Sequence, residues 1–226
     1  GRPLTATALF EAPGPESWHP NPDFLYARGG GPLLDMGPYY LSTLVQLLGP
    51  VAEVSARAST ARATRRIGSG PRAGEHVPVE VPTYLAALLG FRGGTSAVGT
   101  FSFQASRPRV GVVELCGTEG TIVLGDPNGF DGTLRIWRDG MEDEAEAEVH
   151  PAVGSVFSRG AGVVELTRAI RAGRPERASG EVAYHVLDVM LSIGEAAERG
   201  EVVRIASTAA VPPVLPEGWD PTAATL

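Results

Sequence analysis

An acid and a phenol, Asp35 and Tyr39, are the residues of this sequence whose types and spacing most directly suggest chemistry. They stand four residues apart, about one helical turn, so a helix would place both side chains on one face. A carboxylate can orient a substrate hydroxyl and a phenol can transfer a proton, so the pair suits acid–base catalysis. Gly37 between them leaves room for a close approach, and the glycines of 29–31 let the backbone turn sharply beforehand.

The segment around this pair predicts a helix. Pro38 lacks an N–H, which favours a place in the first turn, so we expect the helix to begin near 34–36 with Asp35 as its N-cap. Apolar residues then recur at helical spacing until Gly49-Pro50, which is a strong stop signal. A purely structural interpretation stays open at this point, in which Asp35 only caps the helix and Tyr39 only packs.

The stretch GGGPLLDMGPYY at 29–40 resembles the GGGxLxDxGxH segment of the glucose–fructose oxidoreductase / inositol dehydrogenase / rhizopine-catabolism (Gfo/Idh/MocA) family. Tyr39 stands where many members have His, although members resembling glucose–fructose oxidoreductase and dihydrodiol dehydrogenase also carry Tyr. WHPNPDF at 18–24, CGTEGTIVL at 116–124 and GRPERASGEVAYHVLDVM at 173–190 extend the resemblance. It spans nearly the whole chain, in the order of the family's C-terminal domain.

This resemblance implies an NAD(P)-dependent oxidoreductase that transfers a hydride between a nicotinamide cofactor and a sugar, polyol or related hydroxyl or carbonyl compound. It implies roles for seven residues: catalytic Tyr39 and Asp35, substrate-binding Trp18, His19 and Gly37, and cofactor-binding Gly30 and Gly31. An aromatic face at Trp18 suits the apolar side of a sugar ring. The simpler interpretation, that Trp18 only anchors its loop, is equally open.

Family members begin with a Rossmann domain that carries a GxGxxG turn and a Glu-Lys-Pro motif. This sequence has no GxGxxG turn followed by a helix, and all of its 19 basic residues are Arg. We therefore expect 1–226 to be a single C-terminal substrate-binding and oligomerisation domain whose own N-terminal Rossmann domain is absent. Alone it should bind neither NAD nor NADP and should be inactive. A non-catalytic sugar-binding or scaffolding module of the same fold is the alternative function.

Composition narrows the class of protein. The net charge of −7 argues against a nucleic-acid partner, and no apolar run approaches the ~20 residues that span a membrane. The one cysteine, Cys116, is expected to be a small buried residue in a protein of the reducing cytoplasm. His185 is expected to be a structural histidine within a helix. No set of His, Cys or carboxylate residues has the spacing of a metal site, so none is predicted.

Patterns of alternating residues predict strands in a block between helices. Strands are expected at 4–10, 51–62, 81–91, 95–104, 110–116, 121–124, 133–138 and 144–150, with a short edge strand at 202–205. Turns are expected at 106–109 and 117–120, a loop at 64–75, and helices at 162–172 and 181–199, the last with Ser179 as its N-cap. The acidic run 142–148 is expected to form a solvated strand or hairpin edge, and 208–226 is expected to be a flexible tail.

This order of elements predicts an α+β fold with a large, mostly antiparallel open sheet and helices on one face. Short links between strands favour antiparallel pairing. The second face of such a sheet needs another cover, and a second copy of the chain is the usual one. We therefore expect a homo-oligomer that forms through this sheet face.

Overall fold

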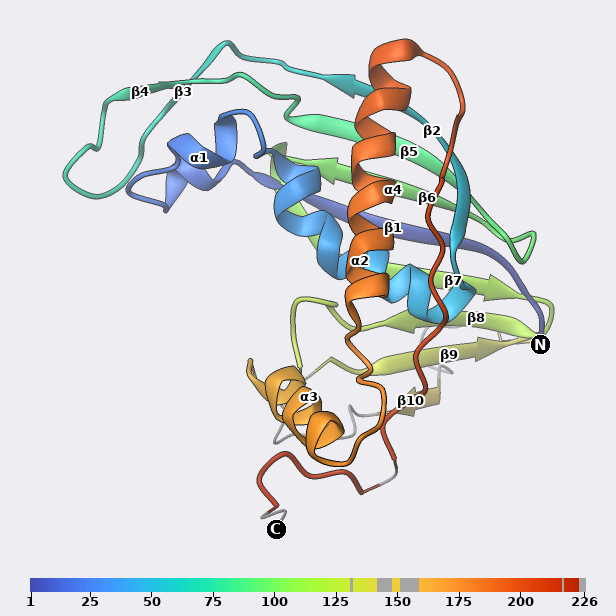
Figure 1. The fold of residues 1–226 in the computed structure, drawn as a ribbon. Coiled ribbons are helices and arrows are strands. Elements are labelled where there is room, and N and C mark those ends of the chain that lie inside the picture. The colour runs from blue at the N-terminus through green and yellow to red at the C-terminus, as the bar shows by residue number, and fades with distance from the viewer. Residues whose placement is uncertain (131, 142–147, 151–158, 217, 224–226) are drawn as a thin grey trace.

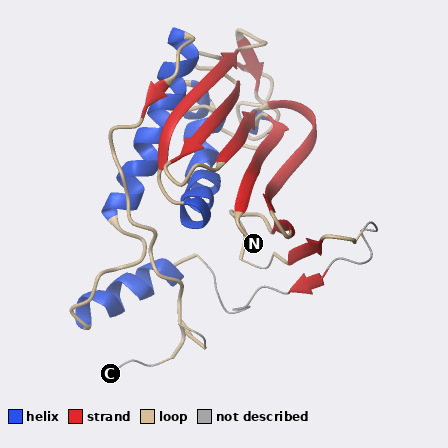
Figure 2. Ribbon diagram, turned by 90° about the vertical axis from the view of Figure 1, so that its right-hand side faces the viewer, coloured by secondary structure: helices blue, strands red, loops and turns tan. Residues whose placement is uncertain are grey.

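The computed structural model describes residues 1–130, 132–141, 148–150, 159–216 and 218–223. It shows a nine-stranded, mostly antiparallel open sheet with helices packed on one face, so the predicted α+β fold is confirmed (Figures 1 and 2). The strands of this sheet are β1 (Pro3–Pro13), β2 (Val51–Ser59), β5 (Tyr84–Phe91), β6 (Ser96–Ser102), β7 (Gln104–Gly117), β8 (Gly120–Leu124), β9 (Leu134–Arg138), β10 (Glu148–His150) and β11 (Val203–Arg204).

The strand order is β10-β9-β8-β7-β1-β6-β5-β2-β11. β1 lies between β6 and β7, parallel to β6 and antiparallel to β7. Every other pairing in this sheet is antiparallel. Two further strands, β3 (Thr64–Arg66) and β4 (His76–Pro78), form a separate two-stranded arm, which extends beyond the sheet beside α1 (Figure 1).

The described residues also form five helical segments: the 3-10 turn η1 (Pro15–Ser17), the short α1 (Asp23–Tyr26), α2 (Pro32–Leu48), α3 (Ala161–Arg171) and α4 (Gly180–Arg199). α2 and α4 cover one face of the sheet, whereas α3 lies apart at its lower end (Figures 1 and 2). The side chain of Ser179 accepts a hydrogen bond from the N–H of Val182, which confirms it as the N-cap of α4.

The core lies between this helix layer and the sheet. Alternate residues of β1, β5 and β6 are buried against α2 and α4, among them Ala8, Leu89 and Phe101. Burial of such apolar surface is the main force that holds the helices on the sheet. The intervening residues, such as Thr7, Leu88 and Val98, face away from the helices, and no described segment of the chain covers this second face of the sheet.

The beginning of α2 differs from the prediction. The helix begins at Pro32, its N-cap is Gly31, and the Asp35 side chain makes no cap. Pro32 takes the first-turn place that the sequence analysis gave to Pro38, so Pro38 lies inside the helix. A proline there costs about 3 kcal/mol, and the continuous buried face on both sides of it offsets this cost.

Three further predictions, those for 106–109, 64–75 and Cys116, also need correction. The stretch 106–109 is not a turn but part of the long β7, because β1 separates β7 from β6 and no hairpin joins them. The predicted loop 64–75 contains β3. Cys116 is half-buried rather than buried, on the open face of the sheet beside Thr5. Of the acidic run 142–148, only Glu148 lies within the described residues, where it begins β10.

The tail after β11 forms hydrogen bonds with residues of α2, of α3 and of the segment between α3 and α4. Gln46 donates a hydrogen bond to the Pro212 carbonyl, and Arg177 donates to the carbonyls of Pro213 and Val214. Arg168 of α3 donates to the carbonyls of Asp220, Pro221 and Ala223. The tail therefore has defined contacts up to Ala223, and its flexibility stays a prediction.

Candidate functional site

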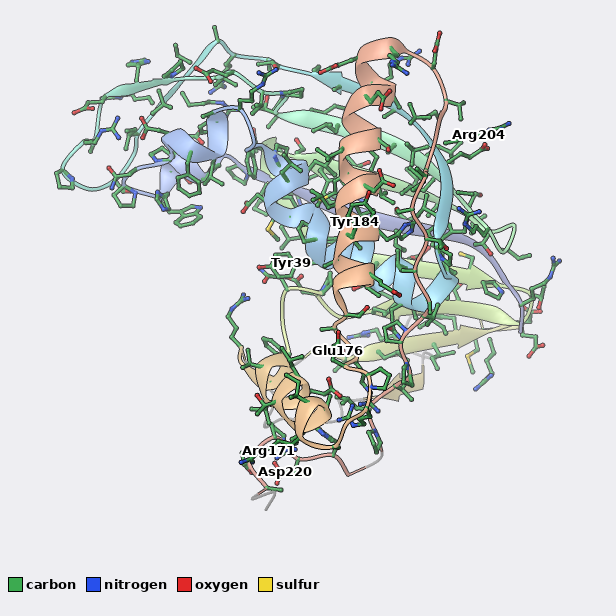
Figure 3. The ribbon with its side chains drawn as sticks, viewed as in Figure 1. Tyr39, Arg171, Glu176, Tyr184, Arg204 and Asp220 are labelled. Carbon is green, nitrogen blue, oxygen red and sulfur yellow. The ribbon has the colours of Figure 1, made fainter. Side chains whose placement is uncertain are left out.

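Asp35 and Tyr39 lie on the outer face of α2, as their spacing predicted. The opposite face of this helix packs on the sheet through buried residues that include Leu41 and Leu44. Asp35 is exposed and Tyr39 is half-buried. Tyr39 projects on the side of α2 away from α4 (Figure 3). Within the described ranges, neither the carboxylate nor the phenol oxygen has a hydrogen-bond partner, so both are available to a ligand or a further domain.

The surroundings of Asp35 alter its acidity. Partial burial against its neighbours raises the pKa of the carboxyl above its usual range, even though the residue is exposed overall. Its backbone N–H donates to the carbonyl of Gly31 at 3.0 Å, within the first turn of α2. A carboxylate in a first turn also interacts favourably with the helix dipole. The backbone of Asp35 is therefore part of the first helical turn, and among the described residues its carboxylate oxygens have no hydrogen-bond partner.

The two adjacent tyrosines have different environments. Tyr40 is fully buried, and its hydroxyl oxygen accepts a hydrogen bond from the N–H of Gly111 at 2.7 Å. Burial, with a smaller contribution from the nearby Asp126, raises the pKa of the Tyr40 phenol to about 12, although the hydrogen bond from the Gly111 N–H acts in the opposite direction. Tyr40 is thus a structural residue, and only Tyr39 presents its phenol oxygen outward.

Gly37 has a packing role. A Cβ added there would lie 2.9 Å from Sδ of Met190 in α4 and 3.1 Å from Cδ1 of Leu33. The sequence analysis predicted a close approach at this residue, but the group that approaches is the neighbouring helix. The side of Gly37 on which a Cβ would lie faces the core and not the face that carries Asp35. The structure therefore gives no support for its assignment to substrate binding.

Gly30 and Gly31 form the turn that joins α1 to α2. The N–H of Gly30 donates to the Ala27 carbonyl and that of Gly31 to the Leu25 carbonyl, both within 2.9 Å. Gly31 has φ = 90°, and a Cβ on Gly30 would lie 2.4 Å from the Phe24 carbonyl oxygen. Both positions therefore require glycine for local reasons, and the turn leaves the start of α2 without a side-chain cap.

This glycine turn forms one end of a groove of about 890 Å³ between α2, α4 and the start of β5. Its walls include Leu33 and Leu34 of α2 and Leu191 of α4. Asp35 and Tyr39 do not line it. Three carboxylates line the rest of the groove, those of Glu80, Glu195 and Glu198. Arg28 lines the groove as well, and Glu195 forms an ion pair with Arg199 at 2.7 Å.

Trp18 and His19 lie in the loop before α1. The Trp18 ring is 67% exposed and packs edge-on against the His19 ring at a centroid distance of 5.3 Å. The Ser69 hydroxyl donates to the Trp18 carbonyl at 2.7 Å, which anchors the loop through its backbone and leaves the indole free. The described contacts bind these residues to the β3–β4 arm and not to Asp35 or Tyr39.

A buried polar cluster next to this loop was not predicted from the sequence. Arg65 of β3 is 6% exposed and donates to Glu16 at 3.1 Å and to the Phe103 carbonyl at 3.1 Å. The Tyr26 hydroxyl donates to the same Glu16 carboxylate, and the guanidinium of Arg65 lies 5.7 Å from the Tyr26 ring centre. These contacts join η1, α1, β3 and the end of β6. Only tertiary contact could reveal them, because Arg65 looks like a surface residue in the sequence.

The sequence predicts neither a metal site nor a membrane-spanning helix. Among the described residues, no group of three or more His, Cys, Asp or Glu side chains could hold a metal ion. None of the helices in the described ranges is long and apolar enough to cross a membrane.

A comparison with protein families matches residues 1–123 to the GFO/IDH/MocA C-terminal domain. The chain belongs to this family. The match covers more than half of the chain and includes the glycine turn, all of α2 and the strands up to β8. No curated protein matches the chain significantly.

Solved structures of several oxidoreductases share the fold. An NAD-binding oxidoreductase from Klebsiella pneumoniae is 21% identical, with a TM-score of 0.71, over 92% of this chain and 60% of its own. Levoglucosan dehydrogenase in complex with NADH and L-sorbose is 18% identical, with a TM-score of 0.70, over 92% and 59%. Aldose–aldose oxidoreductase from Caulobacter crescentus, complexed with glycerol, is 22% identical, with a TM-score of 0.66, over 90% and 56%. The chain thus spans about 60% of the length of the first of these relatives.

Proposed function

We propose that this chain is the substrate-binding and oligomerisation half of an NAD(P)-dependent oxidoreductase that acts on a sugar, a polyol or a related hydroxyl or carbonyl compound. The observation that carries the proposal is the pair of an exposed Asp35 and a half-buried Tyr39 on one face of α2, neither with a side-chain hydrogen-bond partner among the described residues, in a domain of the GFO/IDH/MocA family. A non-catalytic module would have no need of an unpartnered acid and phenol on the same helical face.

In this function Tyr39 exchanges a proton with the substrate oxygen while the hydride moves. Asp35 accepts hydrogen bonds from neighbouring substrate hydroxyls and holds the reacting carbon in position. Bound NAD or NADP supplies the hydride acceptor or donor. A nearby cation would help Tyr39 to take up a proton from the substrate, because a cation stabilises a phenolate. The sequence contains no lysine, so the lysine that the resemblance implies must come from a Rossmann domain outside these 226 residues.

The cofactor would meet this domain at Gly30 and Gly31. The start of α2 next to them has no side-chain cap, which suits a group that accepts hydrogen bonds. This surface is small, so the domain alone is expected to bind no dinucleotide. Trp18 and His19 would border the substrate. The sugar named with levoglucosan dehydrogenase and the name of the aldose–aldose oxidoreductase support a sugar or polyol as substrate.

Oligomerisation would use the open face of the sheet. Leu88 of β5 and Val98 of β6 are register partners on this face, and they are 52% and 48% exposed. Apolar residues side by side on an uncovered sheet are typical of a subunit interface. A cytoplasmic location stays a prediction from the cysteine content.

The test is turnover of the longer protein that contains this chain behind its Rossmann domain. NADH and NADPH formation are followed by absorbance with a panel of aldoses, ketoses, anhydrosugars and polyols. The proposal predicts turnover of at least one of them. If the protein binds a sugar from the panel but reduces neither cofactor, the non-catalytic sugar-binding module becomes the better account.

A further inference from the structure

The loop between β8 and β9 lies against the face of α2 that carries Tyr39. Thr43 follows Tyr39 by one helical turn, and together with residues of this loop it lines a cavity of about 250 Å³. Figures 1 and 3 show the loop, yellow-green in Figure 1, on the side of α2 on which Tyr39 projects. Residues four apart on a helix have Cβ atoms roughly 6 Å apart, so a substrate held at Tyr39 can extend into this cavity. We call it the β8–β9 cavity.

Short contacts hold this loop against α2. A Cβ added to Gly111 would lie 2.7 Å from Cβ of Asp126, and the Gly111 N–H donates to the Tyr40 hydroxyl oxygen at 2.7 Å. At the base of the loop, a Cβ added to Gly125 would lie 2.5 Å from Cα of Gly132. The two ends of the loop therefore touch through glycine backbone, and Asp126 has a defined place beside α2.

The β8–β9 cavity combines apolar walls with one available carboxylate oxygen. Leu124, Phe130 and Leu134 line it beside Asp126. Oδ1 of Asp126 accepts the N–H of Asn128 at 2.9 Å. Oδ2 has no hydrogen-bond partner among the described residues. An ionised carboxylate only accepts hydrogen bonds, so this oxygen suits a ligand that donates one, such as a hydroxyl group.

No cation balances this carboxylate among the described residues of the cavity wall, because none of them is basic. Arg159 binds the loop, at Oδ1 of Asn128 over 2.8 Å, but it does not line the cavity. On the other side of Tyr39, Asp35 adds a second carboxylate one turn earlier in α2. A carboxylate or phosphate of a substrate would meet like charge here, whereas a hydroxyl group would meet acceptors.

From this arrangement we infer that the β8–β9 cavity is a specificity subsite, in which Asp126 accepts a hydrogen bond from a substrate hydroxyl and rejects substrates that carry a carboxylate or phosphate at that end. This inference rests on the proposed function and deepens it, because it narrows the substrate class to uncharged hydroxyl compounds. The walls at Leu124, Phe130 and Leu134 would contact the carbon skeleton. Apolar walls with a single polar group are the usual means of fixing a small ligand in one orientation.

The test compares neutral sugars with acids that differ from them only at the terminal carbon. D-glucose is paired with D-glucuronate, and D-galactose with D-galacturonate. Their binding to the longer protein, with its Rossmann domain and reduced cofactor bound, is measured by ligand-observed nuclear magnetic resonance, which needs no turnover. We expect the neutral member of at least one pair to bind about tenfold or more tightly than its acid. Equal affinities within both pairs, tighter binding of the acids, or no binding of any of the four would overturn the inference.

Asp126→Asn removes the charge and keeps an oxygen that can accept the Asn128 N–H. We expect it to reduce the preference for the neutral sugar at least about threefold, chiefly by tighter binding of the acid. Asp139→Asn is the matched control, because Asp139 is an exposed aspartate in the turn after β9 and does not line the cavity. Its preference should equal that of the unmodified protein. A full preference in Asp126→Asn, or the same change in both variants, would show that Asp126 does not determine specificity.

Turnover separates this inference from the proposed function. Tyr39→Phe should keep the preference for neutral sugars in binding, because Tyr39 is not part of the cavity wall. If the longer protein turns over uronates as well as neutral sugars, only the subsite falls. If it binds neutral sugars preferentially but turns over none of them, only the catalytic proposal falls.

Discussion

Nε2 of His185 in α4 accepts a hydrogen bond from the backbone N–H of Val51, at the start of β2, over 3.0 Å. On the other side of the ring, Nδ1 lies 2.8 Å from the Ser207 hydroxyl. The Ser207 N–H in turn donates to Asp188 of the same helix. His185 is fully buried, so it joins α4, β2 and the segment after β11 as a structural histidine, as the sequence analysis predicted.

This contact predicts that the domain loses stability in acid. A ring that accepts at Nε2 must be unprotonated there, and burial lowers the pKa of His185, opposed by Asp188 and assisted by Arg92. The folded state therefore binds fewer protons than the unfolded state below the usual His pKa of about 6.5. The contribution of His185 is present above that pH and falls by at most ~1.4 kcal/mol per unit below it. Chemical unfolding at several pH values measures this.

The matched control is His185→Gln, whose amide can still donate and accept but does not titrate. Its free energy of unfolding should depend less on pH between about 6.5 and 5 than that of the unmodified chain. An equal dependence in both proteins would show that other groups cause the acid sensitivity.

Gly37 and Met190 should be energetically coupled. In the unmodified chain, Gly37→Ala places a methyl group 2.9 Å from Met190 Sδ, and we expect a net destabilisation of about 1 kcal/mol from overpacking. In a Met190→Ala background the same change should stabilise by up to ~1 kcal/mol, because Ala is the better helix former, the clash with Met190 is gone, and Leu33 Cδ1 at 3.1 Å has room to shift. A double-mutant cycle by urea unfolding measures the difference. Additive effects would refute close packing at this contact.

A charged side chain on the open face of the sheet should dissociate the oligomer. Leu88→Arg puts a cation on this face, beside its register partner Val98, so light scattering should show a monomer in place of an oligomer. Leu187→Arg is the control, because Leu187 is similarly exposed, at 44%, but lies on α4 on the other side of the sheet. Cys116 provides a second readout, since the only thiol of the chain lies on the open face.

In the oligomer, a thiol reagent should modify Cys116 more slowly than in Leu88→Arg. A monomeric mass for the unmodified chain, or equal dissociation of the two arginine variants, would argue against an interface at this face.

Local sequence patterns predicted many of the helix ends and turns of this fold. The Ser179 cap, the stop at Gly49 and the hairpin turn of 117–120 depend on neighbouring residues, so they could be predicted. Long-range pairing could not. The parallel pairing of β1 with β6 brings together residues about 90 positions apart, and no local sequence pattern predicts this pairing. The same holds for the β3–β4 arm, whose short strands are stabilised by Arg65 contacts that only the tertiary fold creates.

The candidate site shows the same limit. Asp35 and Tyr39 share a helical face because spacing alone decides it. The environment of Gly37 depends on a helix some 150 residues later in the chain, so the sequence indicated a close approach but not which group approaches. Asp126 gave no signal of its own, since only the folded chain brings its loop against α2.

The central claim, proton transfer by Tyr39, is tested most directly by Tyr39→Phe in the longer protein with its Rossmann domain. Phe keeps the ring and removes the oxygen, so turnover should fall about 10²–10⁴-fold across the pH range while the affinity for the cofactor is unchanged. Tyr184→Phe is the control: Tyr184 is a 64% exposed tyrosine on α4, and its loss should leave turnover intact (Figure 3). Turnover of Tyr39→Phe near that of the unmodified enzyme at every pH would contradict the account and make Tyr39 a packing residue.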